Sequence, residues 1–118
     1  MKFSEWLNEQ DKYKSYSVGD IITSDGKEPY TGDQQTPIKG KKYKLVQTPL
    51  SKFDYTRQDV YDNSDPEYKE EDDNDIANMK KNFDKLPPIP NEGDGLHRIV
   101  VAKELGKDTI LQWIELKD

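Results

Sequence analysis

Residues 93–106 read GDGLHRIVVAKELG, and this stretch decides the fold that we expect for the chain. Glycines directly before an apolar run predict a sharp turn that opens a helix, which we place at about residues 96–105. Gly106 is positioned to end that helix, because glycine readily adopts the left-handed conformation that follows a last helical turn. The stretch also contains the single histidine and one of the two arginines of the chain.

The start of this helix has the features of a phosphate-binding turn. Helix N-termini attract anions through unpaired N–H groups and a partial positive charge. We expect Gly93 and Gly95 to let the backbone approach a phosphate, and Arg98 to bind two of its oxygens. His97 would donate a hydrogen bond or neutralise developing charge, and Asp94 would hold Mg²⁺ or orient a nucleophile, so these two are the candidate catalytic residues. A structural alternative makes Asp94 a helix N-cap, His97 a loop cap and Arg98 a solvated side chain.

Three pieces of sequence carry a resemblance to a known family: DGLHR at 94–98, AKELG at 102–106 and the apolar segment from 109. Together they resemble the signature of the ParB/sulfiredoxin-like superfamily, the ParB N-terminal-like domain, over about residues 75–118. In that family an Asp-Gly-x-His-Arg turn opens a helix that binds nucleotide phosphate. The resemblance implies ATP or another nucleotide as ligand, with or without Mg²⁺. For an enzyme it implies phosphotransferase or NTPase activity.

A departure from the family pattern limits what the resemblance implies. Sulfiredoxins carry a catalytic cysteine directly before the His-Arg pair, whereas this chain has Leu96 there and contains no cysteine. Thiol-dependent reduction of a sulfinic acid is therefore excluded. A second catalytic carboxylate is not evident, and Asp54, Asp59 and Glu92 stay equal candidates.

A lysine cluster supports a second interpretation. The cluster consists of Lys39, Lys41, Lys42 and Lys44, with Tyr30 and Tyr43 nearby. Lysines can follow a nucleic-acid backbone while an aromatic ring stacks on a base, so the alternative function is a DNA-binding or ParB-like nuclease module. The structural alternative is an edge strand that lysines protect from pairing with other chains.

A third interpretation is a non-catalytic, virus-encoded interaction module. It would bind a protein partner through Phe3 and Trp6 and through an acidic loop at 62–75, which holds eight acidic residues and one lysine. These carboxylates lack the spacing and the central glycine of an EF-hand. A solvated loop is the simpler explanation of so much charge.

The composition narrows the class of protein. Charged residues make up 36% of the 118 residues and hydrophobic residues 31%, and the net charge is -6, which argues against broad binding to polyanions. One histidine and no cysteine argue against a zinc site. No apolar run has the length to span a bilayer, and the N-terminus lacks a signal-peptide core, so we expect a cytoplasmic protein.

The expected fold is α+β, with a small mixed sheet, the phosphate-binding turn opening a helix, and an N-terminal β-rich extension. It would form a single domain, with a short helix and the extension in residues 1–47 and the core in residues 48–118. We expect strands at 18–23, 41–46, 50–54 and 109–116, and a helix from Asp75 to about residue 85. Tyr43 and Leu45 should share one face of the second strand. Apolar residues on both faces place the last strand inside the sheet.

Overall fold

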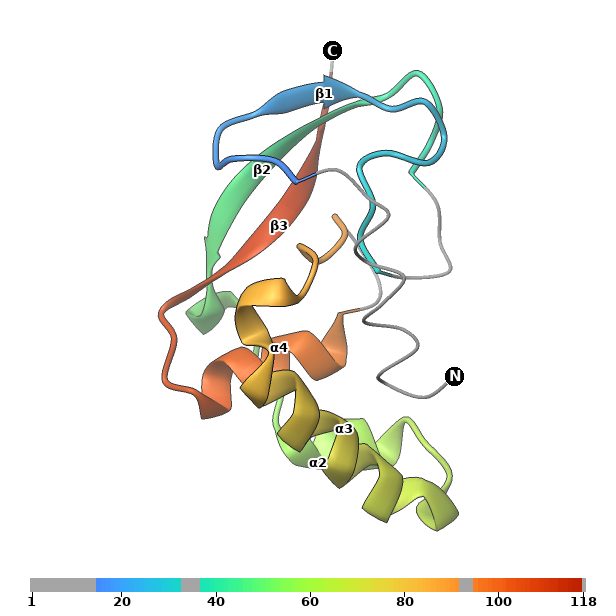
Figure 1. Cartoon of the computed structure of the whole chain (residues 1–118), viewed down its shortest axis with the longest axis vertical. Helices are drawn as coiled ribbons and strands as arrows, with labels where there is room; N and C mark the ends of the chain where they lie inside the picture. Colours follow the sequence, from blue (N-terminus) through green and yellow to red (C-terminus); the bar gives the residue numbers. More distant parts are fainter. Residues whose placement is uncertain (1–14, 33–36, 92–94, 118) are drawn as a thin grey trace.

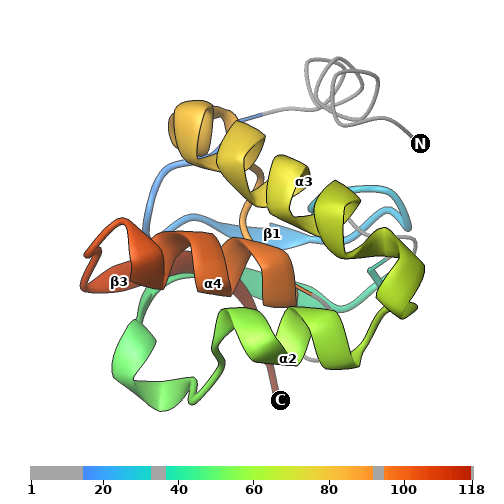
Figure 2. The same cartoon turned by 90° about the horizontal axis from the view of Figure 1, so that it is seen from below.

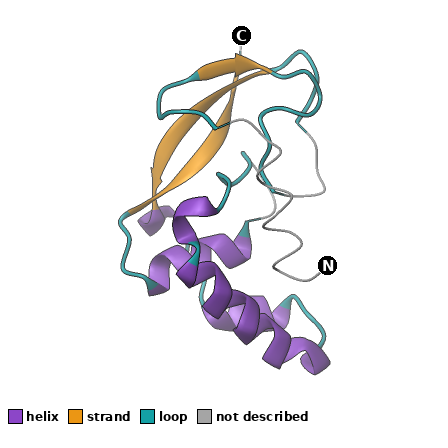
Figure 3. Ribbon diagram, in the orientation of Figure 1, coloured by secondary structure: helices purple, strands orange, loops and turns teal. Residues whose placement is uncertain are grey.

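The computed structural model describes residues 15–32, 37–91 and 95–117. A three-stranded antiparallel sheet in the order β1-β2-β3 lies at one end of the molecule and the helices lie at the other (Figures 1 and 3). The strands are β1 (Ile21–Thr23), β2 (Lys42–Pro49) and β3 (Thr109–Leu116), and the α-helices are α2 (Arg57–Asp62), α3 (Lys69–Lys81) and α4 (Leu96–Glu104). Short 3-10 helices span Leu50–Lys52, Pro66–Tyr68 and Phe83–Lys85. The α+β class is thus confirmed, but the expected mixed sheet is wrong, because the three described strands pair only antiparallel.

β2 and β3 form the main ladder, and the expected alternation of β2 is confirmed. Tyr43 and Leu45 are buried on one face while Lys42 and Lys44 are exposed on the other. On that other face, nearer the helices, the Thr48 hydroxyl donates a 2.6 Å hydrogen bond to the Gln112 side chain. Both side chains are buried, and this cross-strand bond gives each of them a hydrogen-bond partner.

The bounds expected for β3 are confirmed, but its expected place inside the sheet is wrong, because β2 is the central strand. The outer side of β3 meets an isolated parallel bridge at Ile89, whose N–H donates to Leu111 and whose carbonyl accepts from Trp113. β3 carries apolar residues on both faces because each face is covered along part of its length by a different segment. Ile110 packs with Ile99 of α4, and Trp113 packs with Leu45.

The N-terminal segment covers the Trp113 face of the sheet. Tyr16 lies edge-on to the Trp113 ring, with 5.2 Å between ring centroids, and Ile22 packs on the same cluster. β1 is shorter than expected, because Val18 and Gly19 form a turn before it. The short helix predicted at the N-terminus, which would begin at Ser4 and end near Lys12, and the side chains of Phe3 and Trp6 lie outside the described residues.

The acidic segment is largely helical, so the predicted loop at 62–75 and the predicted helix start at Asp75 are wrong. α3 begins at Lys69, and Glu70, Glu71 and Asp72 occupy its first turn, where carboxylates interact favourably with the helix dipole. α3 ends at Lys81, with lysines in its last turn, and a 3-10 turn follows it. The predicted strand at 50–54 is also wrong, because Leu50–Lys52 is a 3-10 turn.

α4 lies between α3 and α2 (Figure 2), and its predicted extent is confirmed within a residue. Gly106, at φ +74°, ends it as expected: its N–H donates to Lys103, and the Lys107 N–H donates to Ala102. These two bonds form a Schellman motif. Leu105 sits at the cap and is partly exposed, so it does not belong to the buried face. In the described ranges, no helix combines the length and apolarity that a membrane crossing requires.

Candidate functional site

The predicted phosphate turn is described only from Gly95 onward, because Gly93 and Asp94 lie outside the described residues. Gly95 is the N-cap of α4 and has φ +112°, a conformation that L side chains rarely adopt. A Cβ atom at this position would lie 2.9 Å from Cγ2 of Ile89. Both its backbone angle and its surroundings therefore require glycine where the turn meets the helix.

Arg98 is buried at the start of α4, with 4% of its surface exposed. Its Nη1 donates to three backbone carbonyls: those of Pro87 at 3.0 Å and Pro88 at 3.1 Å, and that of Thr31. The solvated position considered for Arg98 is therefore wrong. The guanidinium joins three segments that are distant in sequence: the N-terminal extension, the proline segment before Ile89, and α4.

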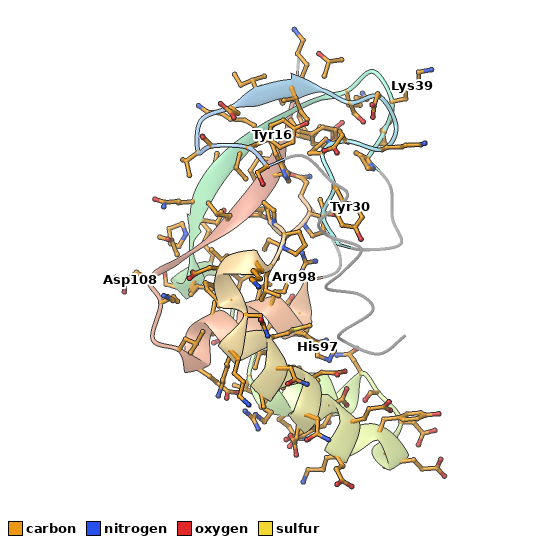
Figure 4. All side chains as sticks on the ribbon, in the orientation of Figure 1. Tyr16, Tyr30, Lys39, His97, Arg98 and Asp108 are labelled. Atoms are coloured by element: carbon orange, nitrogen blue, oxygen red, sulfur yellow. The ribbon has the colours of Figure 1, made fainter. Side chains whose placement is uncertain are left out.

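His97 points to the other side of the α4 start, toward α3, whereas Arg98 faces the N-terminal segment (Figure 4). The His97 Nε2 atom lies 3.4 Å from Asp72 Oδ1. The Asp72 side chain is 11% exposed and also accepts a hydrogen bond from the Ser64 hydroxyl, whereas the imidazole is 38% exposed. A buried carboxylate beside a half-exposed imidazole can fix the orientation of that ring.

Sequence reasoning missed Asp72. The spacing of Asp72 from Ile76 could have identified it as an inward-facing residue. The two are four residues apart on α3 and share a helix face, and Ile76 is fully buried. Burial raises the pKa of the nearby Asp75 carboxyl, and the charges of Glu71 and Asp72 raise it further, while His97 lowers it. The imidazole therefore faces a carboxylate-rich side of α3.

The other candidate carboxylates do not join this pair in the described structure. Asp59 closes a capping box at the start of α2, where it accepts a 2.6 Å hydrogen bond from the Thr56 N–H. Asp54 is exposed in the turn before α2, and Glu92 lies outside the described residues. Among the residues with described positions, no group of three histidine or acidic side chains could hold a metal ion.

All four residues of the lysine cluster are exposed, at the sheet end of the molecule. Lys39 lies there, far from His97 and Arg98 (Figure 4). The edge-strand explanation is wrong, because Lys42 and Lys44 belong to the central strand. Tyr43 is 7% exposed, and its hydroxyl accepts a hydrogen bond from the Ile38 N–H, so its ring does not offer a stacking surface.

An ion-pair network that sequence reasoning missed connects the three helices. Arg57 of α2 donates two hydrogen bonds to Glu104 of α4, at 3.0 and 2.5 Å, and Lys80 of α3 donates to the same carboxylate at 2.7 Å. The Arg57 hydrogen bonds are the main cause that holds the pKa of Glu104 below its ordinary value of 4.5, and the Lys80 bond acts in the same direction. The network fixes how the helices that carry His97 and Asp72 lie against each other.

Replacing Glu104 with glutamine is expected to lower the free energy of unfolding by about 1 kcal/mol at neutral pH, as for a good partly exposed ion-pair network. Because folding lowers the pKa of Glu104, its contribution is present above pH 4.5 and is lost as the pH falls through the folded-state pKa. Urea denaturation across this range should show the two proteins converging in acid. Glu67→Gln, at an exposed position, is the control, and an equal loss at acidic and neutral pH would contradict the prediction.

No family model matches the chain, and no match was found among curated proteins or solved structures.

Proposed function

We propose that the chain binds a phosphorylated ligand, most simply a nucleotide such as ATP, at the turn that opens α4, and that His97 is the acid-base group of this site. The observation that carries the proposal is the contact of His97 with Asp72 of α3, because His97 lies in the first turn of a helix that begins at a left-handed glycine. A helix start supplies backbone donors for phosphate, and the imidazole adds a side chain that can act as a general acid or base.

The contacts of Arg98 suggest a different role from the one expected for it. A guanidinium that already donates to three carbonyls serves to hold the turn in place, so we assign Arg98 as a positioning residue. His97 and the backbone of the first helical turn would then contact the phosphate. Gly93 and Asp94 keep the roles proposed from sequence, namely close backbone approach and Mg²⁺ binding.

The pair also suggests how a proton would move if the site turns over its ligand. With Nε2 of His97 donating to Asp72, the lone pair on Nδ1 can accept a proton from water or from an acceptor hydroxyl. The oxygen freed of that proton would attack the terminal phosphorus, and the bond from that phosphorus to the bridging oxygen would break. The nucleoside diphosphate would leave, and the phosphoryl group would remain on the attacking oxygen. Asp72 would stabilise the resulting imidazolium, which a buried carboxylate does effectively.

The test is calorimetric titration with ATP, with and without Mg²⁺, together with an assay of phosphate release. His97→Asn should weaken ATP binding by about tenfold through the loss of the imidazole contact beside the phosphate. Any hydrolysis should fall by about 100-fold or more through the loss of a general base. Asp72→Asn should reduce turnover more than binding. Lys81→Gln, an exposed position on α3, is the matched control.

Absence of ATP binding to the wild-type protein under both conditions would reject the proposal. So would equal binding by wild type and His97→Asn. An Arg98 variant does not distinguish these outcomes, because losing its carbonyl contacts would disturb the turn whether or not a ligand binds there.

A further inference from the structure

One half of a sheet face is open to solvent, and we name it the open sheet face: Ile21, Lys42, Lys44, Ile114 and Leu116. The register places Ile21, Lys44 and Ile114 in one row across the three strands. Lys42 pairs with Leu116 in the next row on the same side, because residues two apart on a strand share a face. The Ile21 residue is 55% exposed, and both lysines are exposed.

The other half of the same face is covered by helices. Thr48, Ile110 and Gln112 lie on this side of the sheet and are all buried. Ile110 packs against Ile99 and Ala102 of α4. The helices gather at this end, and β1 lies at the far end (Figure 1). The face therefore changes from core to surface along the length of β2.

The open sheet face borders a hollow of about 430 Å³ at the end of the β2–β3 ladder. Its lining consists of Gly40, Lys41, Lys42, Glu115, Leu116 and Lys117. The acidic residue of this lining, Glu115, lies 3.9 Å from the Lys41 ammonium group, so its charge is partly offset. The other charged residues of the hollow and of the open sheet face are lysines. Their positive charge complements an anionic partner.

The side chains beside these lysines are aliphatic except for Thr23, which pairs with Lys42. Nucleic-acid surfaces that bind single strands combine lysines with exposed aromatic rings, but here Tyr43 is buried on the opposite face. Ile21, Ile114 and Leu116 instead offer an aliphatic surface, which suits aliphatic side chains of a protein. We propose that the open sheet face binds an acidic, aliphatic-containing segment of a partner protein. This proposal is independent of the α4 turn.

The test uses the full chain, labelled with ¹⁵N, and a short peptide of alternating glutamate and leucine. Saturable chemical-shift changes should map to the open sheet face. Lys42→Gln/Lys44→Gln and, separately, Ile21→Ser should each raise the dissociation constant by about fivefold, since each change removes a modest charged or apolar contact. Lys81→Gln/Lys85→Gln, which removes two exposed lysines at the helical end, is the charge-matched control and should leave it unchanged.

Two further probes identify the class of partner. An equally charged glutamate–serine peptide should bind more weakly than the glutamate–leucine peptide, because it lacks aliphatic side chains. Oligothymidine that binds more tightly than the peptide and is insensitive to Ile21→Ser would overturn the proposal in favour of a nucleic-acid surface. The absence of saturable shifts with the peptide would also overturn it, as would shifts caused only by self-association of the chain.

Discussion

Replacing Arg98 with methionine is expected to lower the free energy of unfolding by about 3–5 kcal/mol, because a hydrogen-bonded charged group is lost and three carbonyls stay buried without their donor. Methionine has a similar length but supplies no donor to the carbonyls of Thr31, Pro87 and Pro88. Because Arg98 is only 4% exposed, bulk water does not readily replace the lost donors.

Urea denaturation followed by circular dichroism measures this effect. Lys52→Met removes an exposed positive charge outside the site and should change the unfolding free energy by less than about 0.5 kcal/mol, as is typical of surface substitutions. Arg98→Lys should lie between wild type and Arg98→Met, because one ammonium group reaches the three carbonyls less well than a planar guanidinium. A loss below about 1 kcal/mol for Arg98→Met would show that these bonds contribute little to stability.

Replacing Gly95 with alanine is expected to cost about 2–4 kcal/mol, because left-handed backbone strain and overpacking add together. The backbone angle of φ +112° is strained for any L side chain. The new Cβ would also approach Ile89 Cγ2 to 2.9 Å, and Ile89 has little room to move, since it is 1% exposed and its backbone bonds to β3 at Leu111 and Trp113.

Gly40→Ala separates these two causes. Gly40 has φ +87°, and among the described residues no atom beyond its chain neighbours lies within 4 Å of the place that an alanine Cβ would take, so we expect only the backbone term of about 1–2 kcal/mol. The excess loss in Gly95→Ala then measures the contact with Ile89. Combining Gly95→Ala with Ile89→Ala should cost less than the sum of the single changes, because the clashing Cγ2 atom is removed. Equal losses in Gly95→Ala and Gly40→Ala would contradict the steric explanation.

The Gly95 substitution also bears on the proposed function. Backbone donors at a helix start bind phosphate only when the turn before them has the required path. A Gly95→Ala protein that is still folded at low temperature should therefore bind ATP more weakly than wild type. His97→Asn should weaken binding without a comparable loss of stability, since the imidazole is partly exposed.

The local signals in the sequence were sufficient for α4, β2 and β3. Periodic apolar residues and Gly106 define α4, and alternation over residues 41–46 marks β2, because these patterns depend only on neighbours along the chain. The continuation of β2 to Pro49 was not predicted. The first half of α3, from Lys69 to Asn74, escaped this reasoning, since the apolar stripe of α3 is reduced to Ile76 and Met79 among acidic residues. Its helical form depends on charges placed favourably at its two ends and on packing against α4.

The sequence by itself determined that a glycine turn opens a helix carrying His97 and Arg98. Tertiary structure decided what these side chains contact, because their partners are far away along the chain. Asp72 is 25 residues from His97, and Thr31 is 67 residues from Arg98. Hydrophobic burial brings such segments together, and this burial carries no directional information about which polar groups will meet. Distance along the chain also explains the wrong edge-strand interpretation of Lys42 and Lys44. The strands that flank β2 are β1 and β3, and both are far from β2 in sequence.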